Sequence, residues 1–557
     1  VTVNITAGMD RAGPASRASD GTTSSPAVGL PALELPESDV AVADHPVAEA
    51  DDGSGHPPDP PASPHSAPVQ EARRTLSAAR LGSAVGLAAS WGLLAGAWTP
   101  RGPLTTGEAL VSIVVSVVVG FGAAMVARSQ WVVLAGPVAF AIAFEIVRWG
   151  TDGPTVDMPR QSAYGLLALV VGRGFHGLVS LAPMAWAAAI GAGWARRRDP
   201  GARSDARVWR RRARQVVAGV LGVGLVVFAA QLARPAGTDE IVDADGDPLP
   251  GSIAELVEVD VNGNRLTMLI RGHATDLPVL LFLAGGPGGS EFGAMRNHLP
   301  ELEEHFVVVT WDQRGAGHSY TALDPTDTYT LDSAVDDTLA VTDYLRERFG
   351  RERIVLAGQS WGSLLGVLAV QARPEAFSSF VGSGQMVSPL ATDTIFYEDT
   401  LDWAEANGHP TLVSDLEANG PPPYDDTLDY EPALSYEHEV YGYDHAPNSE
   451  GAGGFSENFL VEEYALIDQV HLLAGFVDTF SVLYPQIQGV DLRESATELD
   501  VPVVFVQGAH EAGGRAIPFA EWYDLLDAPS KQLVVLDTSG HRPLFEQPDE
   551  FVDALVE

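Results

Sequence analysis

The sequence predicts an α/β fold for the second half of the chain and an apolar, all-α region before it. Beyond residue 250, short apolar strands alternate with helical segments, which is typical of a mainly parallel sheet covered by helices on both faces. Between residues 80 and 233 the chain instead contains long apolar runs. A Gly-x-Ser-x-Gly sequence at 358–362, between a predicted strand and a predicted helix, indicates the chemistry that the sheet supports.

The composition excludes several kinds of site. The chain has 557 residues and no cysteine, so disulfides, thiolate zinc sites and cysteine nucleophiles are excluded. Its formal net charge of −41 argues against nucleic acid as a partner. Residues 1–72 are rich in Pro, Ala, Ser, Gly and Asp, and bury too little apolar surface to offset the entropy of ordering. We therefore expect a disordered tail there, without the basic and apolar pattern of a signal peptide.

Residues 73–233 are predicted to form a transmembrane region of about five helices, since each apolar run is near the length that crosses a bilayer. The alternative is a bundle of buried soluble helices. The runs are 81–98, 105–127, 130–147, 164–194 and 216–233. Four ionisable residues fall towards the outer ends of the third and fourth runs, namely Glu145, Arg148, Arg173 and His176. We expect a local structural role for them, with transport or sensing as the alternative.

The distribution of arginine favours the membrane and sets an orientation. With the N-terminus in the cytoplasm and five crossings, the outer loops hold only Arg101, Arg148 and Arg160, with Arg234 just beyond the last run. The inner side receives Arg73, Arg74, Arg80, Arg128, Arg196, Arg197, Arg198, Arg203, Arg207, Arg210, Arg211, Arg212 and Arg214. This asymmetry predicts a multi-pass cell-membrane protein, with the lipid bilayer as a partner and the rest of the chain on the extracellular side.

A polar linker at 234–250 precedes the predicted hydrolase domain at 251–557. The expected strands are 255–260, 264–271, 278–284, 306–310, 353–357, 378–382, 502–507 and 532–536. The expected helices between them are 331–349, 361–372, 517–527 and 548–556. A mostly helical insertion at about 385–498, after the sixth strand, is where a cap over an active site would lie. Eight strands with a serine turn after the fifth are the arrangement of an α/β-hydrolase fold.

The candidate nucleophile is Ser360, on a tight turn from strand to helix. Gly358 and Gly362 flank it because a side chain at either position would clash across the turn. The backbone N–H groups of Gly286, in the glycine-rich turn after the third strand, and of Trp361 are the candidate oxyanion hole.

The candidate base is His541, in a Gly-His pair on the loop after the last strand. His318 is a base by residue type, but it precedes Ser360, whereas this fold orders its triad as serine, acid, histidine. Glu511, after the seventh strand, is the favoured acid, and Asp537 is the alternative. Asp312 and Arg314, after the fourth strand, are predicted to pair and support the loop beside the pocket.

Four motifs together resemble the proline iminopeptidase-like branch of the α/β-hydrolases, serine peptidase family S33. They are Gly-Gly-Pro-Gly at 285–288, Trp-Asp-Gln-Arg-Gly-Ala-Gly at 311–317, Gly-Gln-Ser-Trp-Gly at 358–362 and Ser-Gly-His at 539–541. The resemblance implies a serine–histidine–acid enzyme with a helical cap and no metal or other cofactor. It implies cleavage of an N-terminal residue from short peptides, or of related amides and esters, and carboxylates in the cap that hold the substrate amine.

The sequence departs from the family pattern at two positions. Ala284 stands where the family usually has histidine, and Glu511 stands where it usually has aspartate. Among the acidic residues of the cap region, Glu457, Glu462 and Glu463 are candidates for binding the amine. The leading hypothesis is a membrane-anchored, outward-facing serine hydrolase. The alternatives are a carboxylesterase or lipase-type hydrolase, a non-catalytic binding or sensing module, and a transporter with an attached hydrolase.

Overall fold

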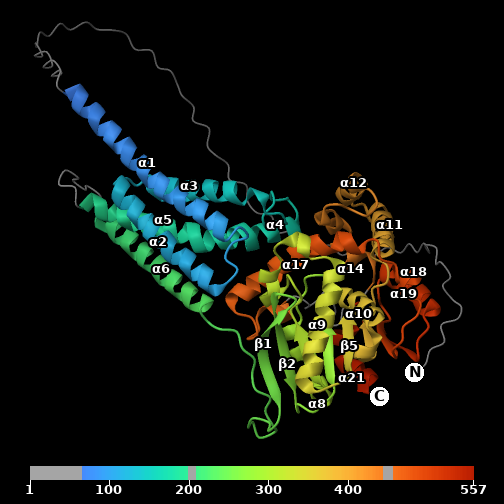
Figure 1. Cartoon of the computed structure of the whole chain (residues 1–557). Helices are drawn as coiled ribbons and strands as arrows, with labels where there is room; N and C mark the ends of the chain where they lie inside the picture. Colours follow the sequence, from blue (N-terminus) through green and yellow to red (C-terminus); the bar gives the residue numbers. More distant parts are fainter. Residues whose placement is uncertain (1–65, 198–207, 443–455, 557) are drawn as a thin grey trace, which may run out of the picture. The chain divides into compact units, whose positions relative to one another are not determined.

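Eight strands form one sheet in the order β1-β2-β4-β3-β5-β6-β7-β8 (Figure 1). The computed structural model describes residues 66–197, 208–442 and 456–556. The strands are β1 Ile253–Val261, β2 Asn264–Gly272, β3 Val279–Leu283, β4 Val307–Trp311, β5 Ile354–Gln359, β6 Phe377–Ser383, β7 Val503–Gly508 and β8 Lys531–Leu536. Strand β2 runs antiparallel to β1 and β4, and the other neighbours are parallel. The predicted fold class is confirmed, and each strand end lies within two residues of its expected position.

Helices cover both faces of the sheet because its central strands are apolar on both sides. One face packs against α9 Leu331–Phe349, α10 Trp361–Ala372 and α19 Gly513–Leu525. The other face packs against α7 Phe292–His298, α8 Leu302–His305, α20 Pro543–Glu546 and α21 Pro548–Val556. Strands β3, β4 and β5 are buried along almost their whole length. The loops at the carboxyl ends of these strands therefore start from a rigid core.

A helical cap is inserted between β6 and β7, as predicted. Its helices are α11 Pro389–Asn407, α12 Pro410–Asn419, α13 Glu431–Leu434, α14 Glu437–Val440, α16 Ser456–Phe459, α17 Leu466–Ile487 and α18 Leu492–Ser495. Helix α17 packs against the loop after β4, where Thr479 Oγ1 donates a hydrogen bond of 2.8 Å to the Gly315 carbonyl. Gly475 of the same helix also lies directly against Gly315 and Gly288. The cap thus closes over the two loops that border the predicted active site.

The N-terminal region is helical and apolar. Its helices are α1 Ser66–Trp98, α2 Thr106–Ala127, α3 Val132–Val147, α4 Ala163–Leu169, α5 Phe175–Arg197 and α6 Val208–Leu232. Helix α1 begins at Ser66, inside the range 1–72 that the sequence predicts as tail. The rest of the predicted tail, 1–65, lies outside the described residues. The run expected at 164–194 is divided by a π-helical turn at Val170–Gly174.

Six helices in the described part of the chain are long and apolar enough to cross a membrane. Five of these segments correspond to the predicted apolar runs. The sixth is α17, which is half buried and belongs to the cap. The polar groups in the N-terminal helices pair locally, because Glu145 accepts hydrogen bonds from Arg148 and from Arg173, and His176 lies 3.3 Å from the Ser180 hydroxyl.

A buried carboxylate on α17 joins the N-terminal region to the hydrolase. Asp478 accepts hydrogen bonds from the Arg101 guanidinium at 3.1 Å, the Thr155 hydroxyl at 2.6 Å and the Tyr320 hydroxyl at 2.6 Å. Arg101 also forms an ion pair with Asp324 at 2.8 Å. The side chains of Arg101 and Asp478 are only 2% and 1% exposed, so the buried Asp478 carboxylate is compensated by Arg101, whose own charge is shared between Asp478 and Asp324. Residues 74–557 accordingly form one compact unit.

We expect Asp478→Ala to destabilise the full chain by about 2 to 4 kcal/mol, because it leaves the buried Thr155 and Tyr320 hydroxyls without their acceptor and leaves Arg101 with Asp324 as its remaining carboxylate partner. Thermal unfolding of the detergent-solubilised protein measures the effect. The matched control is Arg265→Ala, which breaks an exposed ion pair with Glu258 and is expected to cost less than about 1 kcal/mol. Equal melting temperatures for the two variants would contradict a structural role for the Arg101–Asp478 pair.

Candidate active site

Ser360 occupies a strained turn between β5 and α10. Its φ is +53° and its ψ is −119°, and a positive φ is uncommon for a residue with a side chain. The flanking glycines make the turn possible. A Cβ added to Gly358 would lie 2.3 Å from the Gly362 carbonyl oxygen, and one added to Gly362 would lie 2.0 Å from that of Leu283. The turn therefore requires glycine at both positions, for the steric reason that the sequence predicts.

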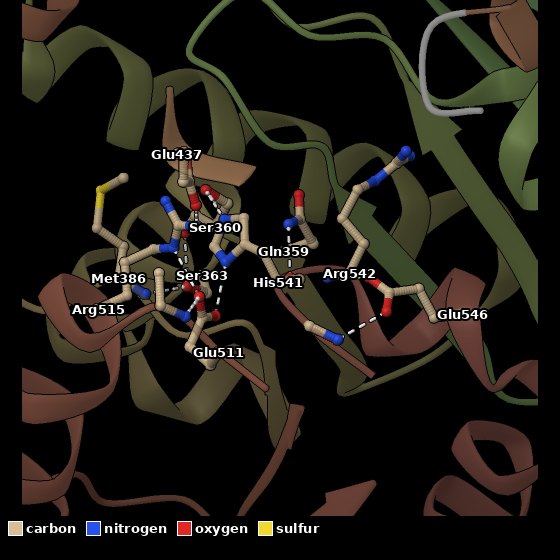
Figure 2. A network of polar contacts seen from close by, with 12 residues as sticks. Gln359, Ser360, Ser363, Met386, Glu437, Glu511, Arg515, His541, Arg542 and Glu546 are labelled. Carbon is tan, nitrogen blue, oxygen red and sulfur yellow. Dashed lines mark hydrogen bonds and ion pairs between the residues drawn. The ribbon is translucent and has the colours of Figure 1, made fainter. Parts of the chain in front are cut away.

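The structure brings Ser360, His541 and Glu511 together (Figure 2). Ser360 Oγ lies 3.0 Å from His541 Nε2, and His541 Nδ1 lies 2.7 Å from Glu511 Oε2. These are hydrogen-bond distances. Asp537, the alternative acid, instead accepts a hydrogen bond of 3.3 Å from Gln547 and is exposed. The geometry thus distinguishes the two carboxylates that the sequence leaves open.

Glu511 is buried and ionised. Its side chain is 5% exposed, and burial by itself would raise the pKa of its carboxyl group. The charges of His541 and Arg515, together with the hydrogen bonds from both, outweigh burial and lower the pKa to about 2. A carboxylate at the far side of the imidazole can hold its tautomer and stabilise the imidazolium form.

The two predicted oxyanion donors lie on segments that meet beside Ser360. A Cβ built on Gly285 would be 3.4 Å from the Cβ of Ser360, so the glycine-rich loop that contains Gly286 approaches the serine. Trp361 follows Ser360 as the first residue of α10, where backbone N–H groups have no partner within the helix. This arrangement places the glycine-rich loop and the N-terminus of α10 on either side of Ser360's backbone turn, as an oxyanion hole would require.

Gln313 links these two segments. In the sequence it is one residue of the motif at 311–317, and the pattern alone gives it no role of its own. Its side chain donates a hydrogen bond of 3.1 Å to the Ala284 carbonyl and accepts one of 3.0 Å from Trp361 Nε1. Gln313 is 3% exposed. We interpret it as the residue that sets the spacing between the glycine-rich loop and the serine turn. Its position between the two predicted supporting residues, Asp312 and Arg314, is the sequence signal that could have identified it.

Asp312 and Arg314 are both buried, but the prediction that they pair with each other is wrong. Arg314 forms an ion pair of 2.9 Å with Asp337 on α9. Asp312 accepts hydrogen bonds from the Ser290 hydroxyl at 2.7 Å and the Tyr464 hydroxyl at 3.0 Å. The two side chains therefore brace different neighbours, Arg314 the helix α9 and Asp312 the residues Ser290 and Tyr464. Their position remains consistent with a supporting role.

His318 contacts Asp312 rather than Ser360. Its Nδ1 lies 2.9 Å from Asp312 Oδ2, and its ring stacks on Tyr464. Burial would lower the pKa of His318, but the hydrogen bond and the charge of Asp312 raise it overall. This histidine therefore belongs to the support of the loop after β4.

Each of the three cap-region acids considered for amine binding contacts a basic side chain. Glu463 is 1% exposed and lies 2.6 Å from the Arg296 guanidinium. Glu457 pairs with His298, and Glu462 pairs with Arg234 at 3.7 Å near the surface. In the described ranges, no cluster of three or more histidine, aspartate and glutamate side chains has a geometry that could hold a metal ion.

Residues 278–548 match the family model described as the alpha/beta hydrolase fold. The chain is 30% identical to the probable aminopeptidase YbaC of Bacillus subtilis (strain 168) over 312 residues, which cover 55% of this chain and 97% of that protein. It is 28% identical to the proline iminopeptidase of Xanthomonas citri over 304 residues, 51% of this chain and 88% of the relative.

Among solved structures, the proline iminopeptidase-related protein from Thermus thermophilus is similar, with 21% identity and a TM-score of 0.40. The similarity covers 54% of this chain and 96% of that one. The family assignment depends on the sequence relationship, which extends over nearly the whole length of the Bacillus protein, and not on this structural similarity. The chain therefore belongs to the α/β-hydrolase family, in the group related to the aminopeptidase YbaC and the proline iminopeptidases.

Proposed function

We propose that this protein is a serine hydrolase that works through an acyl-enzyme, with Ser360, His541 and Glu511 as its catalytic triad. The observation that supports this proposal is the unbroken chain of hydrogen-bond distances from Ser360 Oγ through the His541 ring to the Glu511 carboxylate. A nucleophilic serine needs an adjacent base, and the base needs an orienting group. The strained turn of Ser360 supports the same role, because strain of this kind occurs at functional sites.

The reaction proceeds in two stages. Ser360 Oγ attacks the substrate carbonyl carbon while His541 Nε2 takes the hydroxyl proton, and the N–H groups of Gly286 and Trp361 stabilise the oxyanion. His541 then returns the proton to the leaving amine or alcohol, which departs and leaves an ester on Ser360. In the second stage His541 takes a proton from water, the resulting hydroxide attacks the ester, and Ser360 recovers its proton as the acid is released. Glu511 stays ionised throughout and stabilises the imidazolium.

The substrate class follows from the relatives as a proposal. An aminopeptidase would remove an N-terminal residue from a short peptide or a related amide, and the similarity to the YbaC protein over 97% of its length supports this assignment. An ester-cleaving enzyme is the second candidate. The contacts of Glu457, Glu462 and Glu463 favour it, because two of these carboxylates already pair with arginine and the third already contacts a histidine, instead of standing ready for a substrate amine.

The apolar N-terminal helices are proposed to anchor the hydrolase in the cell membrane. The exposed apolar side chains of α6, such as Val220 and Val226 at 65% and 70%, would be costly in water and suit a lipid environment. Trp149 is 86% exposed at the end of α3, where interfacial aromatic residues occur. The distribution of arginine supports a cytoplasmic N-terminus and an extracellular hydrolase, although part of the basic cluster falls outside the described residues.

The nucleophile is tested by labelling with a fluorophosphonate probe. We expect the purified full chain to become covalently labelled, and Ser360→Ala to remain unlabelled with the same melting temperature. Ser363→Ala is the matched control and should be labelled like wild type. Ser363 lies on α10 one turn later, and its hydroxyl donates a hydrogen bond to the Ser360 carbonyl. Equal labelling of wild type and Ser360→Ala contradicts the proposal. A folded wild-type chain that neither labels nor hydrolyses aminoacyl amides and acyl esters supports a non-catalytic binding module instead.

The choice of acid is tested with Glu511→Gln and Asp537→Asn. We expect Glu511→Gln to lower kcat by about 10³- to 10⁴-fold, because the neutral amide no longer stabilises the imidazolium or selects the productive tautomer. Asp537→Asn should stay within about twofold of wild type, since surface changes remote from a site have small effects. Hydrolysis of a chromogenic aminoacyl amide or ester measures both. The reverse order of effects would make Asp537 the acid.

The orientation is tested by adding protease to intact cells that express the protein with a C-terminal tag. We expect cleavage in the linker at 234–250 and loss of the tag from the cells, while an N-terminal tag stays protected until the cells are permeabilised. Protection of the C-terminal tag would reverse the proposed topology. Release of the whole chain by a salt or carbonate wash would contradict membrane integration altogether.

A further inference from the structure

The two oxygens of the Glu511 carboxylate have different partners. Oε2 faces His541, whereas Oε1 accepts hydrogen bonds from Arg515 Nε at 2.8 Å and from the Ala512 N–H at 2.9 Å. Arg515 lies in the first turn of α19, four residues after Glu511, and its side chain is 10% exposed. The guanidinium charge therefore acts on the Glu511–His541 pair across a desolvated contact, where charges interact strongly.

The far side of the same guanidinium contacts the cap. Its Nη2 group forms an ion pair with Glu437 of α14 (Figure 2). The guanidinium carbon lies 5.0 Å from the ring centre of Phe396 on α11. The side chain of Glu437 is 11% exposed. Arg515 thus sits between the carboxylate behind the imidazole and two helices of the cap. Glu437 is 78 residues from Arg515 in the sequence, so this contact exists only when the cap is seated.

We infer that Arg515 is a positioning residue through which docking of the cap helix α14 sets the basicity of His541, an inference that rests on the proposed triad. The physical argument concerns charge. An unshared guanidinium behind Glu511 disfavours a second positive charge on His541 and so weakens the base. When Glu437 is docked, its carboxylate offsets part of that charge, and the imidazole can take the Ser360 proton more readily.

Other charged groups around His541 leave this argument intact. On the opposite side, Arg542 pairs with Glu291 at 3.0 Å, and Glu546 accepts backbone N–H groups from Gly540 and Arg542. The Arg542–Glu291 pair is internally balanced, and the Glu546 carboxylate is held by the backbone beside the histidine. Among the described cap residues, Glu437 is the carboxylate that forms an ion pair with Arg515, while Asp393 of α11 acts on Arg515 without an ion pair. A movement of α14 therefore changes the charge near the imidazole through the Arg515–Glu437 contact.

The experiment compares the pH dependence of kcat/KM in the full-chain protein, since the acidic limb reports the free enzyme's base. Glu437→Gln removes a negative charge and should move the limb to lower pH by roughly half a unit to one unit. Arg515→Met removes a positive charge and should move it to higher pH by a similar amount. Arg515→Lys keeps the charge and should restore the wild-type limb. Arg493→Met breaks a comparable half-buried ion-pair cluster with Asp491 and Glu521, and should leave the limb unchanged.

Shifts of the acidic limb in opposite directions in Glu437→Gln and Arg515→Met support the inference. A loss of kcat/KM that is equal at every pH, or displacements of the same sign, would reduce Arg515 to a structural residue and overturn it. If Arg515→Met fails to fold, Glu437→Gln and Arg515→Lys decide, because Glu437 touches neither Ser360 nor His541 in the contacts described. A wild-type chain that does not react with a fluorophosphonate would contradict the proposed function itself. An active wild type, with an acidic limb that stays at the same pH in Glu437→Gln and Arg515→Met, would contradict only this inference.

Discussion

The tight turn at Ser360 is the constraint on which the rest of the structure depends. A non-glycine residue with φ of +53° persists only if its surroundings hold it there. The surroundings are the buried strand β5 on one side, helix α10 on the other, and the glycine-rich loop after β3 packed against Gly362. The parallel order of β3, β5, β6, β7 and β8 then carries the loops with Gly286, Glu511 and His541 to the same edge of the sheet.

Buried arginine is the second recurring device. The chain has 74 acidic residues against 33 basic ones, so carboxylates far outnumber their possible partners. In the interior the structure uses single guanidinium groups to join separate segments: Arg101 with Asp478, Arg314 with Asp337, and Arg515 with Glu511 and Glu437. Arginine suits this task because its planar group donates in several directions and stays charged when buried.

The cap helices contact both the loops beside Ser360 and the buried arginines. Helix α17 lies against the loops after β3 and β4, and its Asp478 also binds the Arg101 side chain of the N-terminal region. Helices α11 and α14 meet Arg515 behind the acid. Groups on both sides of the candidate site are therefore held by cap helices, which makes the cap a part of the site's support as well as its cover. The N-terminal helices contribute to that support through Asp478.

Strand periodicity and glycine-rich turns are local signals, so the fold class, the strand positions and the segments that carry Ser360, His541 and Glu511 can be predicted from the amino-acid sequence. The carboxylate that lies against His541 is a tertiary contact, since Glu511 and Asp537 both follow strands at the same sheet edge. The tertiary structure also replaced the expected Asp312–Arg314 pair and supplied the partners of Arg101 and Arg515, which are 377 and 78 residues distant. Long-range ion pairs leave no local pattern, because a buried guanidinium can be matched by any carboxylate that the fold brings near it.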